Sequence, residues 1–186
     1  MSLLGKFGAL RLRAVLIETG YTAWYRAASG SSYGVDPWAA FNAARSQRST
    51  AKGALRLVVD LFLMGYRIQS TAVSRTFGAD AIEGWKRSGL VVEAAGCLTS
   101  KYCLLSSFGK YVLLEFPSTN AGGRFIPSGT YLSQGSYECA LSTVRNGVRG
   151  TFLELGCGSG LSSVMASETA SLVVATDIDQ GALAGC

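Results

Sequence analysis

A short apolar run, Thr151–Leu155, leads directly into three alternating glycines at positions 156, 158 and 160. The run has the length of a buried strand, and residues 161–167 after the glycines have a helix-like composition. Glycine lets the backbone turn sharply without a Cβ and lets a ligand lie against main-chain N–H groups. A strand, a glycine loop and a helix in this order form the first turn of a nucleotide-binding fold. The last part of the chain is therefore predicted to be an α/β domain.

A second strand is predicted at 172–176, and it is followed at once by Asp177, 21 residues after Gly156. In such a sheet the end of the second strand lies beside the first glycine turn. A carboxylate there can accept hydrogen bonds from both hydroxyls of an adenosine ribose. The glycine spacing is GxGxG, with Glu154 two residues before it, whereas NAD enzymes use GxGxxG. The spacing disfavours an NAD-dependent oxidoreductase, which stays open as an alternative.

The run from Glu154 to Gly160 resembles motif I of the class I S-adenosylmethionine-dependent methyltransferases, and Ala175–Asp179 resembles their second motif. The resemblance implies an α/β Rossmann-like methyltransferase domain with S-adenosyl-L-methionine as its cofactor. The sequence VVATDID, followed past Gln180 by Gly-Ala-Leu, resembles the branch that holds release-factor glutamine and ribosomal-RNA guanine-N2 methyltransferases. An enzyme of that branch methylates a nitrogen, so the implied partner is a release-factor-like protein or an RNA.

The resemblance also implies roles for single residues. Glycines 156, 158 and 160 would surround the amino-acid part of the cofactor, and Glu154 would orient that loop or the methionine ammonium through water. Asp177 would hold the ribose and Ile178 would flank the adenine. Cys157 would belong to the same cofactor-binding loop, as a small residue that fills it rather than as a nucleophile.

Residues 125–140 are similar to the stretch before motif I in the family, where a helix closes over the methionine end of the cofactor. The candidate contacts on this helix are Gln134, Gly135, Ser136 and Tyr137. A helix that merely covers the sheet is an equally good interpretation.

In that branch the catalytic loop is of the Asn-Pro-Pro-Tyr type and follows the fourth strand. The sequence ends at Cys186, before any such loop, and contains only the first βαβ unit of the domain. We therefore expect a C-terminally truncated fragment, with the catalytic residues beyond Cys186.

Before the glycine motif, the pattern predicts a mainly α, winged-helix-like domain over 1–116, a linker over 117–130 rich in Pro, Ser, Asn and Gly, and the start of the cofactor domain over 131–186. Helical spacing is found at 9–17 (ended by Gly20), 36–44, 51–64, 70–77, 79–87 and 131–144. The runs 90–93, 98–105 and 110–116 are β-rich and predict a hairpin or a three-strand meander.

All 17 basic residues lie at or before Arg149, together with eight acids, so residues 1–149 carry +9 while the remainder carries −4. A basic first part indicates contact with an anion such as RNA, although a plain solvated surface is an equal alternative. The candidate nucleic-acid contacts are Arg67, Arg75, Lys86, Arg87, Lys101 and Lys110. A non-enzymatic winged-helix module that binds nucleic acid or protein, with a remnant nucleotide motif, is therefore the second hypothesis.

The chain has five cysteines in no CxxC pair and no histidine, which argues against a metal site and a disulfide framework. Basic residues at 6, 11 and 13 interrupt the apolar N-terminal run, so neither a signal peptide nor a membrane span is expected. We expect a cytoplasmic protein.

Overall fold

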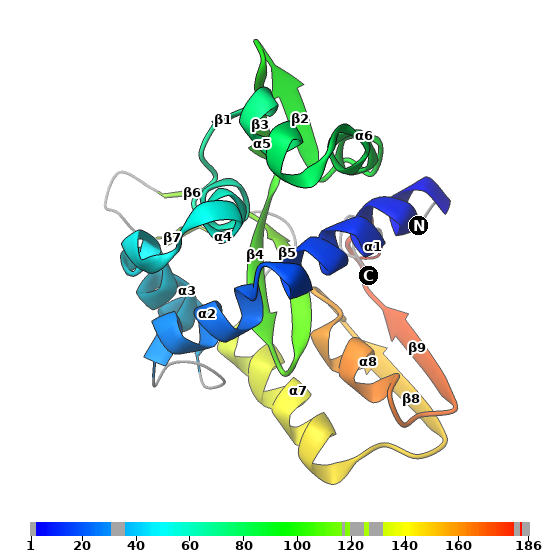
Figure 1. Cartoon of the computed structure of the whole chain (residues 1–186). Coiled ribbons are helices and arrows are strands. Elements are labelled where there is room, and N and C mark those ends of the chain that lie inside the picture. Colours follow the sequence, from blue (N-terminus) through cyan, green and yellow to red (C-terminus); the bar gives the residue numbers. More distant parts are fainter. Residues whose placement is uncertain are drawn as a thin grey trace. The chain divides into compact units, whose positions relative to one another are not determined.

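The computed structural model describes residues 3–30, 36–116, 118–119, 125–126, 132–180 and 183 (Figure 1). The chain divides into two compact units. The first consists of Met1–Gly34 with Trp38–Phe116, and the second of Val35–Pro37 with Pro117–Cys186. Both contain helices and small sheets, so the protein is of mixed α and β structure.

The first unit begins with helices and ends with two small antiparallel sheets. Its helical elements are α1 (Leu3–Glu18), α2 (Tyr21–Ser29), α3 (Pro37–Ser46), η2 (Arg48–Thr50), α4 (Gly53–Val58), the π-helical η3 (Val59–Leu63), α5 (Ser70–Phe77) and α6 (Ala79–Arg87). Its strands are β1 (Ile68–Gln69), β2 (Val91–Ala94), β3 (Cys97–Ser100), β4 (Tyr102–Ser107) and β5 (Lys110–Glu115).

Strands β1, β3 and β2 form one sheet in that spatial order, and α5 and α6 lie between β1 and β2 in sequence. The core beneath this sheet is aromatic. Trp85 of α6 is fully buried, with its ring 5.5 Å from that of Phe62 and 5.8 Å from that of Phe77. α6 carries Asp80 in its first turn and Lys86 in its last turn, charges that suit the helix dipole.

The hairpin β4–β5 forms a separate sheet, and it is tied to α2 by a buried hydrogen bond. The Tyr21 hydroxyl donates to the Leu104 carbonyl over 2.8 Å. Burial raises the pKa of Tyr21 well above its usual value, so this phenol remains a donor throughout the physiological range.

The strand predicted over 98–105 is wrong as a single element, because the chain changes sheets at Lys101. β3 pairs with β1 and β2, whereas β4 pairs with β5 in a different sheet. The Ser100 hydroxyl lies at this break and accepts a hydrogen bond from the Tyr102 N–H over 3.1 Å. A side chain that satisfies a nearby main-chain group competes with the ladder and allows the chain to bend.

The sequence reasoning also missed helix α2. Gly20 has the left-handed φ of +70°, as expected for a helix end, but α2 begins at the next residue. Tyr21 and Tyr25 of α2 are buried, and the Tyr21 hydroxyl binds the carbonyl of Leu104, which is distant in sequence.

The second unit contains β6 (Ser118–Thr119), β7 (Phe125–Ile126), α7 (Gln134–Asn146), β8 (Thr151–Leu155), α8 (Leu161–Ala166) and β9 (Leu172–Thr176). The predicted linker, 117–130, contains the antiparallel pair β6–β7, and its other residues lie outside the described part of the chain. The helix expected at 131–144 is α7, whose first turn is capped by the Ser133 hydroxyl accepting from the Ser136 N–H.

Strands β8 and β9 are parallel, as predicted for a strand–helix–strand unit, and α8 connects them (Figure 1). Leu153 faces Val174 across the ladder, and both side chains are exposed. The alternate residues, such as Glu154, are half-buried on the side of α8. Apolar residues therefore occur on both faces of this sheet, which is typical of parallel sheets covered on both sides.

The contact of α1 with α6 leads to a prediction about stability. At Gly8, an added Cβ would lie 2.5 Å from Ser88 Cβ and 2.6 Å from the Gly84 carbonyl oxygen. Backbone atoms cannot rotate away, so Gly8→Ala is expected to cost roughly 1–3 kcal/mol of unfolding free energy in urea denaturation. The exposed Leu10→Ala on the same helix is the control, and an equal loss in both variants would contradict this packing.

Candidate functional site

The glycine loop between β8 and α8 is built from residues with positive φ. Gly156, Gly158 and Gly160 have φ of +71°, +50° and +66°, a region that L side chains seldom adopt. The N–H groups of Gly156 and Cys157 donate to the Thr176 carbonyl over 2.8 and 2.9 Å. The loop is therefore hydrogen-bonded to the end of β9. Cys157 is 4% exposed and is buried within the loop.

Asp177 lies against this loop. Its Oδ2 accepts a hydrogen bond from the Gly158 N–H over 2.8 Å, and its Oδ1 accepts one from the Asp179 N–H over 2.9 Å. Both hydrogen bonds lower the pKa of the carboxyl group, and the bond from Asp179 has the larger effect. A carboxylate has about four acceptor positions, so lone pairs remain for a ligand. Ile178 beside it is fully exposed.

Glu154 fastens the other side of the loop. Its Oε2 accepts from both the N–H and the hydroxyl of Ser163, over 2.9 and 2.5 Å. Ser163 is in the first turn of α8, where main-chain N–H groups have no partner within the helix. This carboxylate therefore binds the start of α8, where the glycine loop ends.

The candidate cofactor contacts on α7 differ in their exposure to solvent. Gln134 is exposed and donates from Nε2 to Glu138 Oε1 over 3.0 Å, while Tyr137 is 2% exposed. A hollow of about 450 Å³ lies between α7 and β8, and Ser136 lines it. The further α7 residues at this hollow are Cys139, Ser142 and Thr143. The sequence reasoning missed these three, although the helical spacing of 139 and 143 from 136 could have indicated Cys139 and Thr143.

Two serine hydroxyls near the loop were not among the predicted site residues. Ser159 Oγ and Ser162 Oγ are buried and have no hydrogen-bond partner in the described part of the chain. Ser162 also lines the hollow beside β8. Buried hydroxyls without partners are uncommon and call for an explanation. Only their place in the motif could have indicated them in the sequence.

Some of the basic side chains predicted to contact nucleic acid are already bound by groups of the protein itself. Lys86 Nζ donates to Glu83 Oε1 over 2.9 Å and to Glu93 Oε2 over 2.8 Å, so two carboxylates offset its charge. Arg67 donates to the Ala94 carbonyl over 3.3 Å. Of the candidates, Arg67, Arg75, Arg87 and Lys101 are exposed, whereas Lys86 and Lys110 are half-buried. In addition, α1 packs on α6, the helix that carries Lys86.

Two further findings concern metals and membranes. Among the described residues, no three His, Cys, Asp or Glu side chains are grouped so that they could hold a metal ion. Within the same part of the chain, every helix is too short or too polar to cross a bilayer.

The contacts of Asp177 predict its titration. A lowered folded-state pKa means that the carboxylate stabilises the fold above its unfolded pKa and loses this effect as pH falls through the folded value. In carboxyl-carbon NMR we expect a midpoint below 3.8, the ordinary value. The Gly158 and Asp179 amide shifts should follow the same midpoint and lose it in Asp177→Asn. A midpoint at or above 3.8 would contradict the two hydrogen bonds.

The chain was compared with known proteins. No family model matches it, and no curated protein matches it. An assignment of function therefore depends on the geometry of the glycine loop and on the resemblance of its motifs.

Proposed function

We propose that residues 131–186 are the cofactor-binding part of an S-adenosylmethionine-dependent methyltransferase. The methyl acceptor would be a nitrogen of a protein glutamine or of an RNA base. The observation that carries the proposal is the hydrogen bond from the Gly158 N–H to Asp177 Oδ2, at the carboxyl ends of two parallel strands. Ligands of open α/β sheets bind at that end of the strands.

The residues present fit an adenosyl ligand. An added Cβ at Gly156 would meet nothing within 4 Å, so the space over this turn is open. Asp177 retains acceptor positions for two ribose hydroxyls, and the exposed Ile178 can flank an adenine. The glycine loop would hold the amino-acid end of the cofactor, which supplies a methyl group activated on a sulfonium.

The chain's own contribution in this proposal is to bind and orient. Asp177 and the glycine loop fix the cofactor relative to the sheet, and Glu154 fixes α8, on which the loop ends. Holding two reactants in line supplies a large part of the rate of a direct displacement. Cys157 is buried and takes no part as a nucleophile.

For the first unit we propose a winged-helix-like module that contacts the substrate protein or RNA. The support is the element order from α4 to β3, with two helices between β1 and β2 and the sheet order β1-β3-β2. The same observation favours the second hypothesis, a non-enzymatic winged-helix binding protein. A cytoplasmic location stays a prediction.

Calorimetric titration with S-adenosylhomocysteine tests the proposal. We expect binding that weakens about 10- to 100-fold in Asp177→Ala, since a hydrogen bond to a charged group contributes about 1.5–3 kcal/mol. Asp179→Ala is the matched control, because it removes an equal charge two residues away and keeps the N–H that donates to Asp177.

Two results would count against this function. The first is an absence of binding to S-adenosylhomocysteine while NAD binds, which would favour the oxidoreductase alternative. The second is equal affinity in the Asp177 and Asp179 variants, which would show that the carboxylate at the end of β9 does not contact the ligand.

A further inference from the structure

The segment from α3 to α4 has a concentration of positive charge that the proposed winged-helix-like role of the first unit does not explain. It contains Arg45, Arg48, Lys52 and Arg56, and Asp60 is the single acid between Pro37 and Ala79. A surface of this composition attracts anions. The hydrogen bonds of these side chains distinguish an arrangement for a particular anion from a solvated surface.

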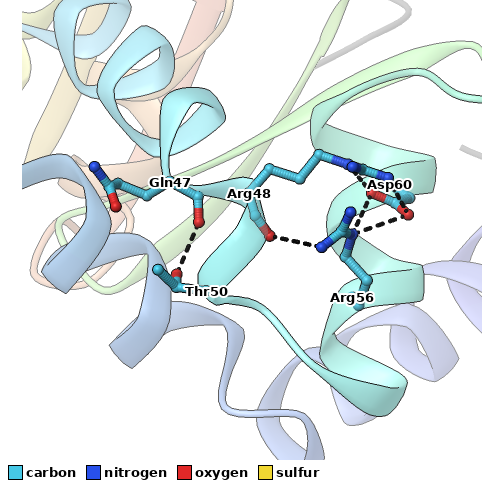
Figure 2. Close-up of polar contacts among 5 residues, drawn as sticks. All are labelled: Gln47, Arg48, Thr50, Arg56 and Asp60. Atoms are coloured by element: carbon cyan, nitrogen blue, oxygen red, sulfur yellow. Dashed lines mark hydrogen bonds and ion pairs between the residues drawn. The ribbon is translucent and has the colours of Figure 1, made fainter.

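Two of the arginines are held in fixed positions by the one acid (Figure 2). Arg48 donates from Nε and Nη2 to the two oxygens of Asp60 over 2.5 and 2.9 Å. Arg56 donates from Nε to the same oxygens over 3.0 and 3.1 Å, and from Nη1 to the Arg48 carbonyl over 3.1 Å. Two guanidinium groups therefore share one carboxylate, and the cluster keeps an excess charge of +1.

Each guanidinium keeps donors that no described residue uses. Arg48 Nη1 and Arg56 Nη2 make no hydrogen bond within the described part of the chain. The two side chains are 31% and 27% exposed, so solvent reaches them. The donors are held in place before any ligand arrives, which reduces the entropy lost on binding.

An exposed aromatic ring lies beside these donors. The Arg48 guanidinium lies 4.9 Å from the centre of the Tyr66 ring, and Tyr66 is 43% exposed. Asp60 belongs to the π-helical η3, where the Met64 N–H donates to the Val59 carbonyl, and the Tyr66 N–H donates to the Asp60 carbonyl over 2.9 Å. Single π-helical turns are rare and occur frequently at functional sites.

We propose that Arg48 and Arg56 form a binding site for a phosphate group. Guanidinium groups match phosphate oxygens through pairs of parallel N–H bonds, and an adjacent aromatic ring can stack on a base. The phosphate belongs either to a single-stranded nucleic acid or to a free phosphate or mononucleotide. The site lies entirely within the first unit and does not depend on the proposed methyltransferase function.

The test measures binding of inorganic phosphate and of a short labelled single-stranded RNA to the whole chain, at constant ionic strength in chloride. Arg48→Lys and Arg56→Lys keep the charge but lose the planar fork, so we expect about ten-fold weaker binding of each ligand that binds the wild type. Arg13→Lys, an exposed arginine on α1 that is not among the candidate nucleic-acid contacts, is the matched control and should change nothing. Affinity for S-adenosylhomocysteine should be the same in all three variants.

A second measurement covers the case in which the lysine variants fail to fold. In the wild type, the side-chain N–H resonances of Arg48 and Arg56 should shift on addition of phosphate, while that of Arg13 does not. Binding of RNA without inorganic phosphate assigns the site to a nucleic-acid backbone, and the reverse assigns it to a small ligand. If neither ligand moves these resonances, or if the lysine variants bind as the wild type does, the proposal is wrong.

Discussion

Two carboxylates hold the glycine loop from opposite sides, and the geometry of the second unit depends on them. Glu154 binds the first turn of α8 through Ser163, and Asp177 binds the loop itself through the Gly158 N–H. Glu154 is in β8 and Asp177 directly follows β9, so the parallel pairing of the two strands sets the separation of the two carboxylates. The loop between them, held by hydrogen bonds to both acids, has left-handed φ values at its glycines.

Local chemistry explains which parts of this site could be predicted from the sequence. The glycines and Asp177 are specified by conformational demands and by position at strand ends, which a sequence displays directly. The contribution of α7 is specified by packing. Whether Ser136 or Tyr137 faces the hollow depends on how α7 rotates against its neighbours, and helical spacing alone does not fix that rotation.

The same distinction applies to the fold of the first unit. The predicted helices at 70–77 and 79–87 coincide with α5 and α6, since Gly78 separates two strongly periodic segments. The change of sheet at Lys101 has no comparable signal, because 98–105 is continuously β-prone and the break depends on the Ser100 hydroxyl and on two distant partners. Tertiary contacts override local preference at such a point.

Net charge predicts that a unit attracts anions, but the pairing of charges decides where. On α6, Lys86 lies between two carboxylates, so this helix has little excess charge at that residue. On η2 and α4 the ratio of basic to acidic side chains is inverted, because the single carboxylate of Asp60 binds two arginines. Exposed charges are screened beyond a Debye length of roughly 8–10 Å. Within that distance, two arginines with one carboxylate leave a net positive potential, whereas one lysine between two carboxylates leaves none. The basic character of the first unit is therefore expected to act through the Arg48–Arg56 pair rather than through α6.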